Sequence, residues 1–121
     1  MERNVKPIRW VGTSLSDLRN FPREVRIDIG QALFTAQEGG TDPAAKPLKG
    51  FGGANVLEIV SSYQGTAWRG VYTVRFHGAI YVLHVFQKKS TKGIATPIKE
   101  IELVRRRLAE AERDHKERQA E

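Results

Sequence analysis

The sequence predicts an α+β fold with the element order β-α-α-β-β-β-α: a small, mainly antiparallel sheet, an N-terminal helical hairpin and a C-terminal helix. Three observations predict it. Apolar residues recur every three or four positions between residues 15 and 36, and again between 98 and 111. Side chains alternate with a period of two in three runs between residues 56 and 87, and short glycine-containing turns separate those runs. We expect the helices to pack on one face of the sheet.

The N-terminal part predicts a strand and two helices. Residues 5–10 form a short mixed run, and Pro7 favours the edge of the sheet because it lacks a backbone N–H. Thr13 is one of two residues placed to cap a first short helix. Pro22 suits the first turn of a second helix, which Gly39 and the glycine after it should end.

The middle of the chain predicts a connection and then a meander. Residues 41–53 are rich in Gly, Pro, Ala and Lys and show no period. A phosphate-binding loop is disfavoured there because no Lys-Ser/Thr pair follows the glycines. Strand-like runs cover 56–63, 67–76 and 79–87, and their short turns favour antiparallel pairing.

The C-terminal part predicts a helix whose apolar stripe stops early. Thr96 is placed as the cap and Pro97 as the first helical residue. The stripe ends at Ala111, so residues 1–111 are expected to form a single domain. Residues 112–121 should fray or project as a charged helix, and deleting them should change stability little.

Composition excludes several classes of protein. The 121 residues contain no Cys, which excludes a disulfide framework and a thiolate metal site. No apolar run reaches the roughly 20 residues of a membrane span. The net charge is +6, and residues 46–99 hold eight basic side chains against one acidic one. That segment is a candidate surface for a polyanion such as nucleic acid, with a solvated basic surface as the plain alternative.

Several cations are predicted to share one sheet face and its neighbouring loops. Without a metal, Arg and Lys must balance the charge of the phosphorane formed when RNA is cleaved. The candidate catalytic residues are Arg69, Lys88, Lys89, Lys49 and His84, and the candidate RNA-binding residues are Lys46, Arg75, Lys92, Phe86 and Tyr72. Phe86 or Tyr72 would stack on unpaired bases. The open alternatives are exposed strand arginines, a packing role for His84, and lysines that protect a sheet edge.

Several short motifs follow one another along residues 45–105. They are Leu-Lys-Gly at 48–50, Leu-Glu-Ile at 57–59, Trp-Arg-Gly-Val-Tyr at 68–72, Phe-Gln-Lys-Lys at 86–89, and Thr-Pro followed by Glu-Ile at 96–101. Together they resemble the RelE/ParE toxin superfamily. The order is similar to that of phage-derived, HigB-like toxins of type II toxin–antitoxin systems. One departure is that no Tyr near the C-terminus matches the catalytic tyrosine of RelE-like nucleases.

The resemblance implies a compact RelE-like domain that cleaves mRNA on the ribosome. Arg69 matches the strand arginine that stabilises the scissile phosphate, Lys88 or Lys89 the basic residue after the last strand, and Lys49, with Lys46 second, the basic loop position. No cofactor is implied. The implied partners are an antitoxin with a helix-turn-helix domain, forming a hetero-oligomer, and the ribosome with its mRNA, in the cytoplasm and away from membranes. A gyrase inhibitor of the same fold and a non-toxic basic module stay open as alternatives.

Overall fold

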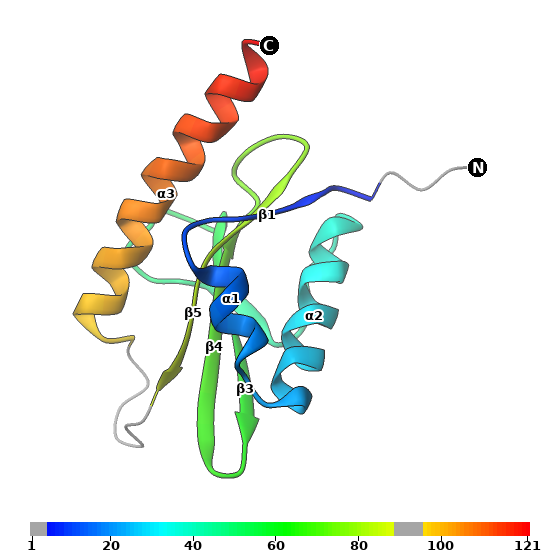
Figure 1. Cartoon of the computed structure of the whole chain (residues 1–121), viewed down its shortest axis with the longest axis vertical. Helices are drawn as coiled ribbons and strands as arrows, with labels where there is room; N and C mark the ends of the chain where they lie inside the picture. Colours follow the sequence, from blue (N-terminus) through cyan, green and yellow to red (C-terminus); the bar gives the residue numbers. More distant parts are fainter. Residues whose placement is uncertain (1–4, 89–95) are drawn as a thin grey trace.

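The computed structural model describes residues 5–88 and 96–121 and confirms the predicted α+β fold (Figure 1). Five strands form one sheet in the order β1-β5-β4-β3-β2. Strand β1 pairs parallel to β5, and the other pairs are antiparallel. The elements are β1 (Ile8–Trp10), α1 (Ser14–Arg19), α2 (Arg23–Gln37), β2 (Ala45–Pro47), β3 (Val56–Tyr63), β4 (Thr66–Thr73), β5 (Ile80–Lys88) and α3 (Ile98–Gln119).

The helices cover both faces of the sheet, so the expectation that they share one face is wrong. Helices α1 and α2 lie on one side and α3 on the other (Figure 1). Two separate apolar clusters result, one containing residues of α2 with Tyr72 and Val82, the other containing residues of α3 with Val71 and Leu83. The central strands are apolar on both faces, and each face is stable only when a helix covers it.

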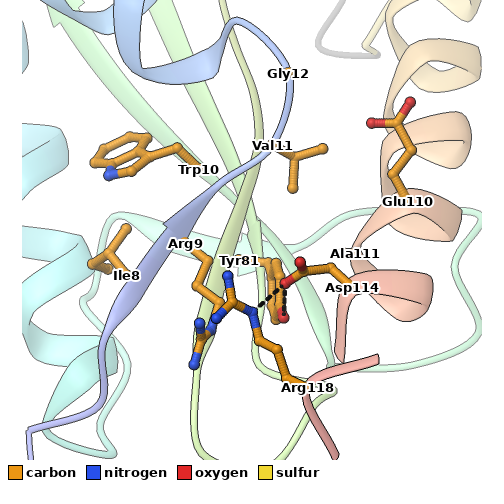
Figure 2. Close-up of a pocket in the computed structure, with 10 residues that line it drawn as sticks. All are labelled: Ile8, Arg9, Trp10, Val11, Gly12, Tyr81, Glu110, Ala111, Asp114 and Arg118. Atoms are coloured by element: carbon orange, nitrogen blue, oxygen red, sulfur yellow. Dashed lines mark hydrogen bonds and ion pairs between the residues drawn. The ribbon is translucent and has the colours of Figure 1, made fainter. Parts of the chain in front are cut away.

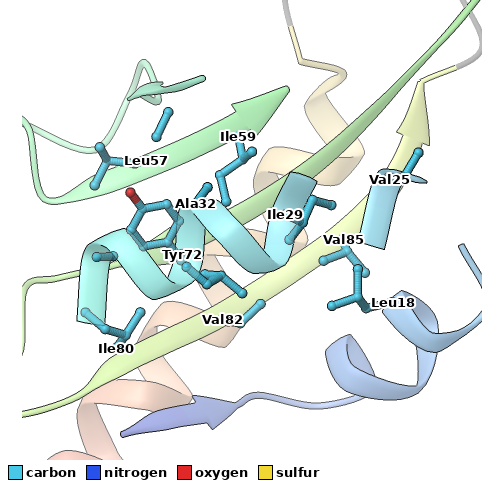
Figure 3. Close-up of a cluster of buried hydrophobic side chains, with 13 residues drawn as sticks. Leu18, Val25, Ile29, Ala32, Leu57, Ile59, Tyr72, Ile80, Val82 and Val85 are labelled. Carbon is cyan, nitrogen blue, oxygen red and sulfur yellow. The ribbon is translucent and has the colours of Figure 1, made fainter. Parts of the chain in front are cut away.

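The cluster beneath α2 anchors the sheet (Figure 3). Val25, Ile29 and Ala32 of α2 are fully buried and pack over β3, β4 and β5. Helix α2 approaches β4 closely at Gly70, where a Cβ would lie 3.4 Å from Cγ2 of Ile29. The predicted apolar face of α2 therefore forms this core as its helical spacing indicated.

A β-bulge in β5 decides which side chains face α3. Val71 pairs with His84 but Tyr72 pairs with Val82, which leaves Leu83 as the extra residue. Strict alternation through residues 79–87 was therefore a wrong expectation: Leu83 joins the cluster beneath α3, whereas Val85 joins the cluster beneath α2. The bulge brings Leu83 and His84 to the same helix.

Several element boundaries differ from those expected. Strand β4 ends at Thr73 rather than residue 76, and the expected connection 41–53 contains the short strand β2. Ile98 is 76% exposed and does not belong to the buried stripe of α3. Helix α3 continues beyond Ala111 to Gln119. Among the described residues, no helix combines the length and apolar character that crossing a membrane requires.

Candidate active site

The candidate site lies on the sheet face that the first half of α3 covers. Cross-strand pairing sets it up: Glu58 of β3 is opposite Val71 of β4, which is opposite His84 of β5. Arg69 is opposite Phe86 in the neighbouring row. Directly opposed residues point to the same face, so these side chains meet beneath α3.

Arg69 is engaged in a buried ion pair. Its Nη1 donates to Oε1 of Glu58 at 2.6 Å, and both side chains are only 10% exposed. Thr96, just before α3, donates its hydroxyl to the other oxygen of Glu58 at 2.8 Å. The Nε of Arg69 is also buried and has no hydrogen-bond partner among the residues that the structure describes. Glu58 thus neutralises the arginine and links it to the start of α3.

His84 is held between two oppositely charged side chains of α3. Its Nε2 lies 3.1 Å from Oε2 of Glu100, and its Nδ1 lies 3.4 Å from Nη1 of Arg107. Because an arginine can only donate, Nδ1 acts as the acceptor and Nε2 carries the proton that goes to Glu100. The ring also stacks on Phe86 at 4.9 Å. Burial lowers the pKa of His84, and the Arg107 charge lowers it further, while Glu100 opposes the shift.

Arg107 fastens α3 to the bulge and to the start of α1. It donates to the carbonyl of Leu83 at 3.0 Å and to the hydroxyl of Thr13 at 3.1 Å. Gly12 makes room for it: its φ is +57°, and a Cβ there would lie 2.9 Å from Nε of Arg107. Neither Glu100 nor Arg107 was expected at the site from the sequence. Their spacing of seven, which places two residues on one helical face, was the available signal.

The accessible cations gather at the rim of this face, around the loop between β2 and β3. Lys46, Lys49 and Arg75 are exposed. Arg75 donates to the carbonyl of Phe51 at 3.3 Å. Arg105 of α3 donates to the carbonyl of Gly50 at 2.8 Å and lies 4.6 Å from the centre of the Phe51 ring. We call Lys46, Lys49, Arg75 and Arg105 the basic rim.

The other expected site residues are more scattered. Tyr72 is 1% exposed in the cluster beneath α2, on the sheet face opposite Arg69, so it cannot stack on a base there. Burial raises its pKa to about 12. Phe86 and Lys88 are each 7% exposed. Lys89 and Lys92 lie outside the described residues, and residues 5–88 and 96–121 contain no His and carboxylate cluster suited to a metal ion.

The predicted site therefore has two parts with different accessibility. Arg69, His84 and Lys88 share a face but are each less than a tenth exposed, whereas the basic rim is mostly open to solvent. The rim can hold a phosphate backbone directly. The buried part contains the Arg69 guanidinium and the neutral His84 imidazole. A substrate reaches these two groups only when the start of α3 moves away from the sheet.

Comparisons with known proteins agree with this architecture. The model of the "Phage derived protein Gp49-like (DUF891)" family matches residues 16–109. A double arginine-to-alanine mutant of the toxin RelE from E. coli, in the free state, superposes with a TM-score of 0.55 at 18% identity, covering 73% of this chain and 88% of that one. The toxin–antitoxin complex RelBE2 from Mycobacterium tuberculosis matches with a TM-score of 0.46 at 20% identity, over 74% of this chain and 98% of that one. No curated protein matches the sequence.

The family match covers most of the chain and includes every described residue among the predicted catalytic and RNA-binding ones. The match to RelE shows that the sheet and its helices follow the RelE arrangement. The predicted resemblance to the RelE/ParE superfamily is confirmed. The chain belongs to the Gp49-like family of phage-derived, RelE-like proteins.

Proposed function

We propose that this chain is the toxin of a type II toxin–antitoxin system and cleaves mRNA on the ribosome without a metal. The observation that supports the proposal best is the meeting of Arg69, His84 and Lys88 on one face of a RelE-like fold, bordered by the basic rim. Metal-free cleavage of RNA needs cations at the phosphate and a group that moves a proton.

Each group has a defined task in the proposed reaction. His84 takes the proton of the ribose 2′-OH, and the 2′-oxygen attacks phosphorus. Arg69 stabilises the phosphorane, with Lys49, Lys88 and Lys89 assisting. The bond to the 5′-oxygen then breaks and that oxygen takes up a proton, which leaves a 2′,3′-cyclic phosphate and a 5′-hydroxyl. Lys46, Arg75 and Lys92 bind the RNA backbone, and Phe86 contacts a base; Tyr72 has no part in this scheme because it is buried on the opposite face.

The reaction requires the site to open. Glu58 occupies Arg69, and Glu100 and Arg107 occupy His84. Phosphate must replace Glu58 as the partner of Arg69, and the start of α3 must release both groups. A ribosome that holds mRNA in an attack-ready geometry would offset part of this cost, which is why we propose ribosome-bound message as the substrate.

The proposed partner is an antitoxin with a helix-turn-helix domain, bound to the toxin as a hetero-oligomer in the cytoplasm. The basic rim is a surface that such a partner would cover with acidic side chains. Covering Lys49 and Arg75 would keep RNA from the site without any change at Arg69.

Mapping of 5′ ends on ribosome-bound mRNA tests the nuclease. We expect the wild-type chain to produce cuts with 5′-hydroxyl ends, also when chelator is in excess of the metal that ribosomes need. Lys49→Ala and the Lys88→Ala/Lys89→Ala double variant should cut at least about tenfold more slowly, since each removes charge at the phosphate. Lys116→Ala, an exposed cation far along α3, is the matched control and should cut normally. Uncut message with the wild-type chain contradicts the proposal.

One observation favours a second candidate function. Arg69 is neutralised by Glu58, and the His84 side chain is 8% exposed, which suits a toxin of this fold that acts by binding alone, as in gyrase inhibition. Pulse labelling after induction separates the two. The nuclease lowers incorporation of amino acids first, whereas a gyrase inhibitor lowers incorporation of thymidine first. A basic module without toxicity lowers neither.

A further inference from the structure

Strand β1 leaves one edge of the sheet open. The Ile80 N–H donates to the carbonyl of Pro7 at 2.9 Å, and the Val11 N–H donates to the carbonyl of Val82 at 3.0 Å. Backbone groups alternate between the two edges of a strand, so the odd-numbered residues of β1 face β5. Ile8 and Trp10 therefore direct their N–H and carbonyl groups outward, away from the sheet.

Along residues 6–10, the outward backbone groups of Lys6 are hydrogen-bonded, whereas those of Ile8 and Trp10 have no partner in the described part of the chain. Lys6 donates its N–H to the carbonyl of Gln37 at 3.1 Å and accepts from the Gln37 amide at 2.6 Å. Nothing comparable covers Ile8 and Trp10 within residues 5–88 and 96–121. An uncovered strand edge of this kind is a template for pairing with another chain.

The opposite edge of the sheet, at β2, is closed. Val60 donates its N–H to the carbonyl of Ala44, so Ala45 and Pro47 face outward. The Ala45 N–H is used by the carbonyl of Asp42 at 2.9 Å, and Pro47 has no N–H. This edge offers no free donor, and β1 is the edge at which a strand can be added.

A pocket of about 420 Å³ lies beside the open edge, between β1 and the last turns of α3 (Figure 2). Arg9 and Arg118 come together there next to Asp114. Arg118 donates through Nε to Asp114 at 2.7 Å, and Asp114 also accepts from the hydroxyl of Tyr81 at 2.7 Å. The Nε of Arg9 is buried and has no hydrogen-bond partner in the described part of the chain. The described lining of the pocket supplies no acceptor for this nitrogen.

The missing acceptor is best supplied by a carboxylate. A planar carboxylate matches the donor fork of an arginine. A nucleic acid fits the surroundings less well, because residues 110–121 hold five acidic side chains and, besides Arg118 itself, only two basic ones, and would repel a polyanion. The pocket also lies apart from the candidate active site: Glu100 and Asp114 are fourteen residues apart on α3, about 21 Å along a helix.

We propose that the edge of β1 binds an extended segment of a partner protein that carries a single Asp or Glu; the segment pairs with Ile8 and Trp10 and places that carboxylate against Arg9 and Arg118. Backbone hydrogen bonds supply affinity and the pocket supplies selectivity, as in other cases of strand addition. Arg9, Asp114 and Arg118 all lie outside the matched family segment 16–109. The proposal does not depend on the nuclease function.

A peptide selection against the full chain tests the proposal. A phage library of random linear peptides is panned on the wild-type protein, and the enriched peptides are synthesised and titrated by fluorescence anisotropy. We expect them to share one Asp or Glu among β-forming residues. Arg9→Gln and Arg118→Gln should weaken binding about tenfold or more, because each removes charged donors to the carboxylate. Arg113→Gln, on the same helix but outside the pocket lining, should bind as the wild type does.

Amide exchange measured by NMR gives a second readout that needs no variant. Peptide binding should slow exchange at Ile8 and Trp10 and change it little at Arg9 and Val11, which already face β5. Absence of enriched peptides, peptides insensitive to Arg9→Gln, or protection without this alternation would each overturn the proposal. It also fails if a single-stranded RNA oligonucleotide alone binds with sensitivity to Arg9→Gln, or if the edge is filled by a second copy of the chain in a concentration-dependent dimer.

Discussion

His84 makes the fold sensitive to pH. Burial lowers the pKa of His84 from its usual 6.5, with Arg107 adding to the shift and Glu100 and Asp17 opposing it. The unfolded chain therefore binds the proton more readily than the folded one. Stability should be complete above pH 6.5 and should fall as the pH drops through 6.5 toward the lower folded value.

Thermal unfolding between about pH 5 and 8 checks this prediction. His84→Gln should flatten the decline below pH 6.5, because the side chain that titrates is gone. His77→Gln, at an exposed turn position, is the matched control and should follow the wild-type curve. Equal pH profiles for wild type and His84→Gln would show that another group governs the response.

The ion pair between Arg69 and Glu58 is expected to stabilise the fold, in addition to any part that Arg69 has in catalysis. Removing one member of a buried ion pair leaves the other charged and unpaired, at a cost of about 3–5 kcal/mol. Arg69→Gln and Glu58→Gln should each cause such a loss in urea unfolding, and the double variant should lose less than the sum. The loss on changing Glu112, whose pair with Lys116 is half exposed or more, should stay below about 1 kcal/mol. If the loss of unfolding free energy in the double variant equals the sum of the two single losses, the two side chains do not stabilise each other.

This consequence affects how activity data on Arg69 should be read. A variant that removes the guanidinium also frees Glu58 and Thr96 beneath α3. Loss of cleavage in Arg69→Gln identifies a role at the phosphate only if Glu58→Gln, equally destabilised, retains more activity. The comparison separates two effects of the substitution: the loss of a cation at the phosphate, and the loss of the ion pair that holds the start of α3 in place.

At the level of elements, the last turns of α3 are bound to the sheet. Asp114 accepts a hydrogen bond from the buried Tyr81, and His115 stacks on Phe76 at 5.3 Å. Deletion of residues 112–121 should therefore lower the free energy of unfolding by about 1–3 kcal/mol, since it leaves the Tyr81 hydroxyl without its partner. The sequence alone predicted almost no effect, because these residues carry no apolar stripe.

Urea unfolding of two truncations checks that prediction. Deletion of residues 119–121 alone, which are exposed, is the control and should change little. If the longer deletion is as stable as the control, the contacts of Asp114 and His115 contribute nothing measurable.

Elements with one clear period could be predicted from the sequence, and those with a local interruption could not. The apolar spacing of α2 located its buried face, and Pro7 correctly indicated an edge strand. The bulge at Leu83 leaves no signature in the sequence, because the alternating apolar pattern of this strand is compatible with Leu83 on either face of the sheet. Since the bulge sets which residues face α3, Glu100 and Arg107 could not be recognised as neighbours of His84.

At the level of the whole molecule, the distribution of positive charge along the sequence differs from its distribution over the folded surface. The positive excess of residues 46–99 predicted a polyanion surface, but Arg69 and Lys88 are buried and contribute little outside. Arg105 comes from a C-terminal segment that is nearly neutral, yet it joins Lys49 and Arg75 around the loop at Gly50 and Phe51. The fold thus builds the basic rim from two regions of the sequence that composition treats separately.

The salt dependence of RNA binding tests that arrangement. Each cation withdrawn from the phosphate backbone should lower the slope of log affinity against log salt by about 0.7 for single strands. Changing Lys46, Lys49 and Arg75 to Gln should therefore reduce the slope by about 2. Changing Arg113, Lys116 and Arg118 to Gln removes the same charge from the far end of α3 and should leave the slope nearly as it was. Titration of a short single-stranded RNA at several salt concentrations measures both. Equal slopes for the two triple variants would mean that RNA responds to net charge alone, and the basic rim would then have no special role in binding.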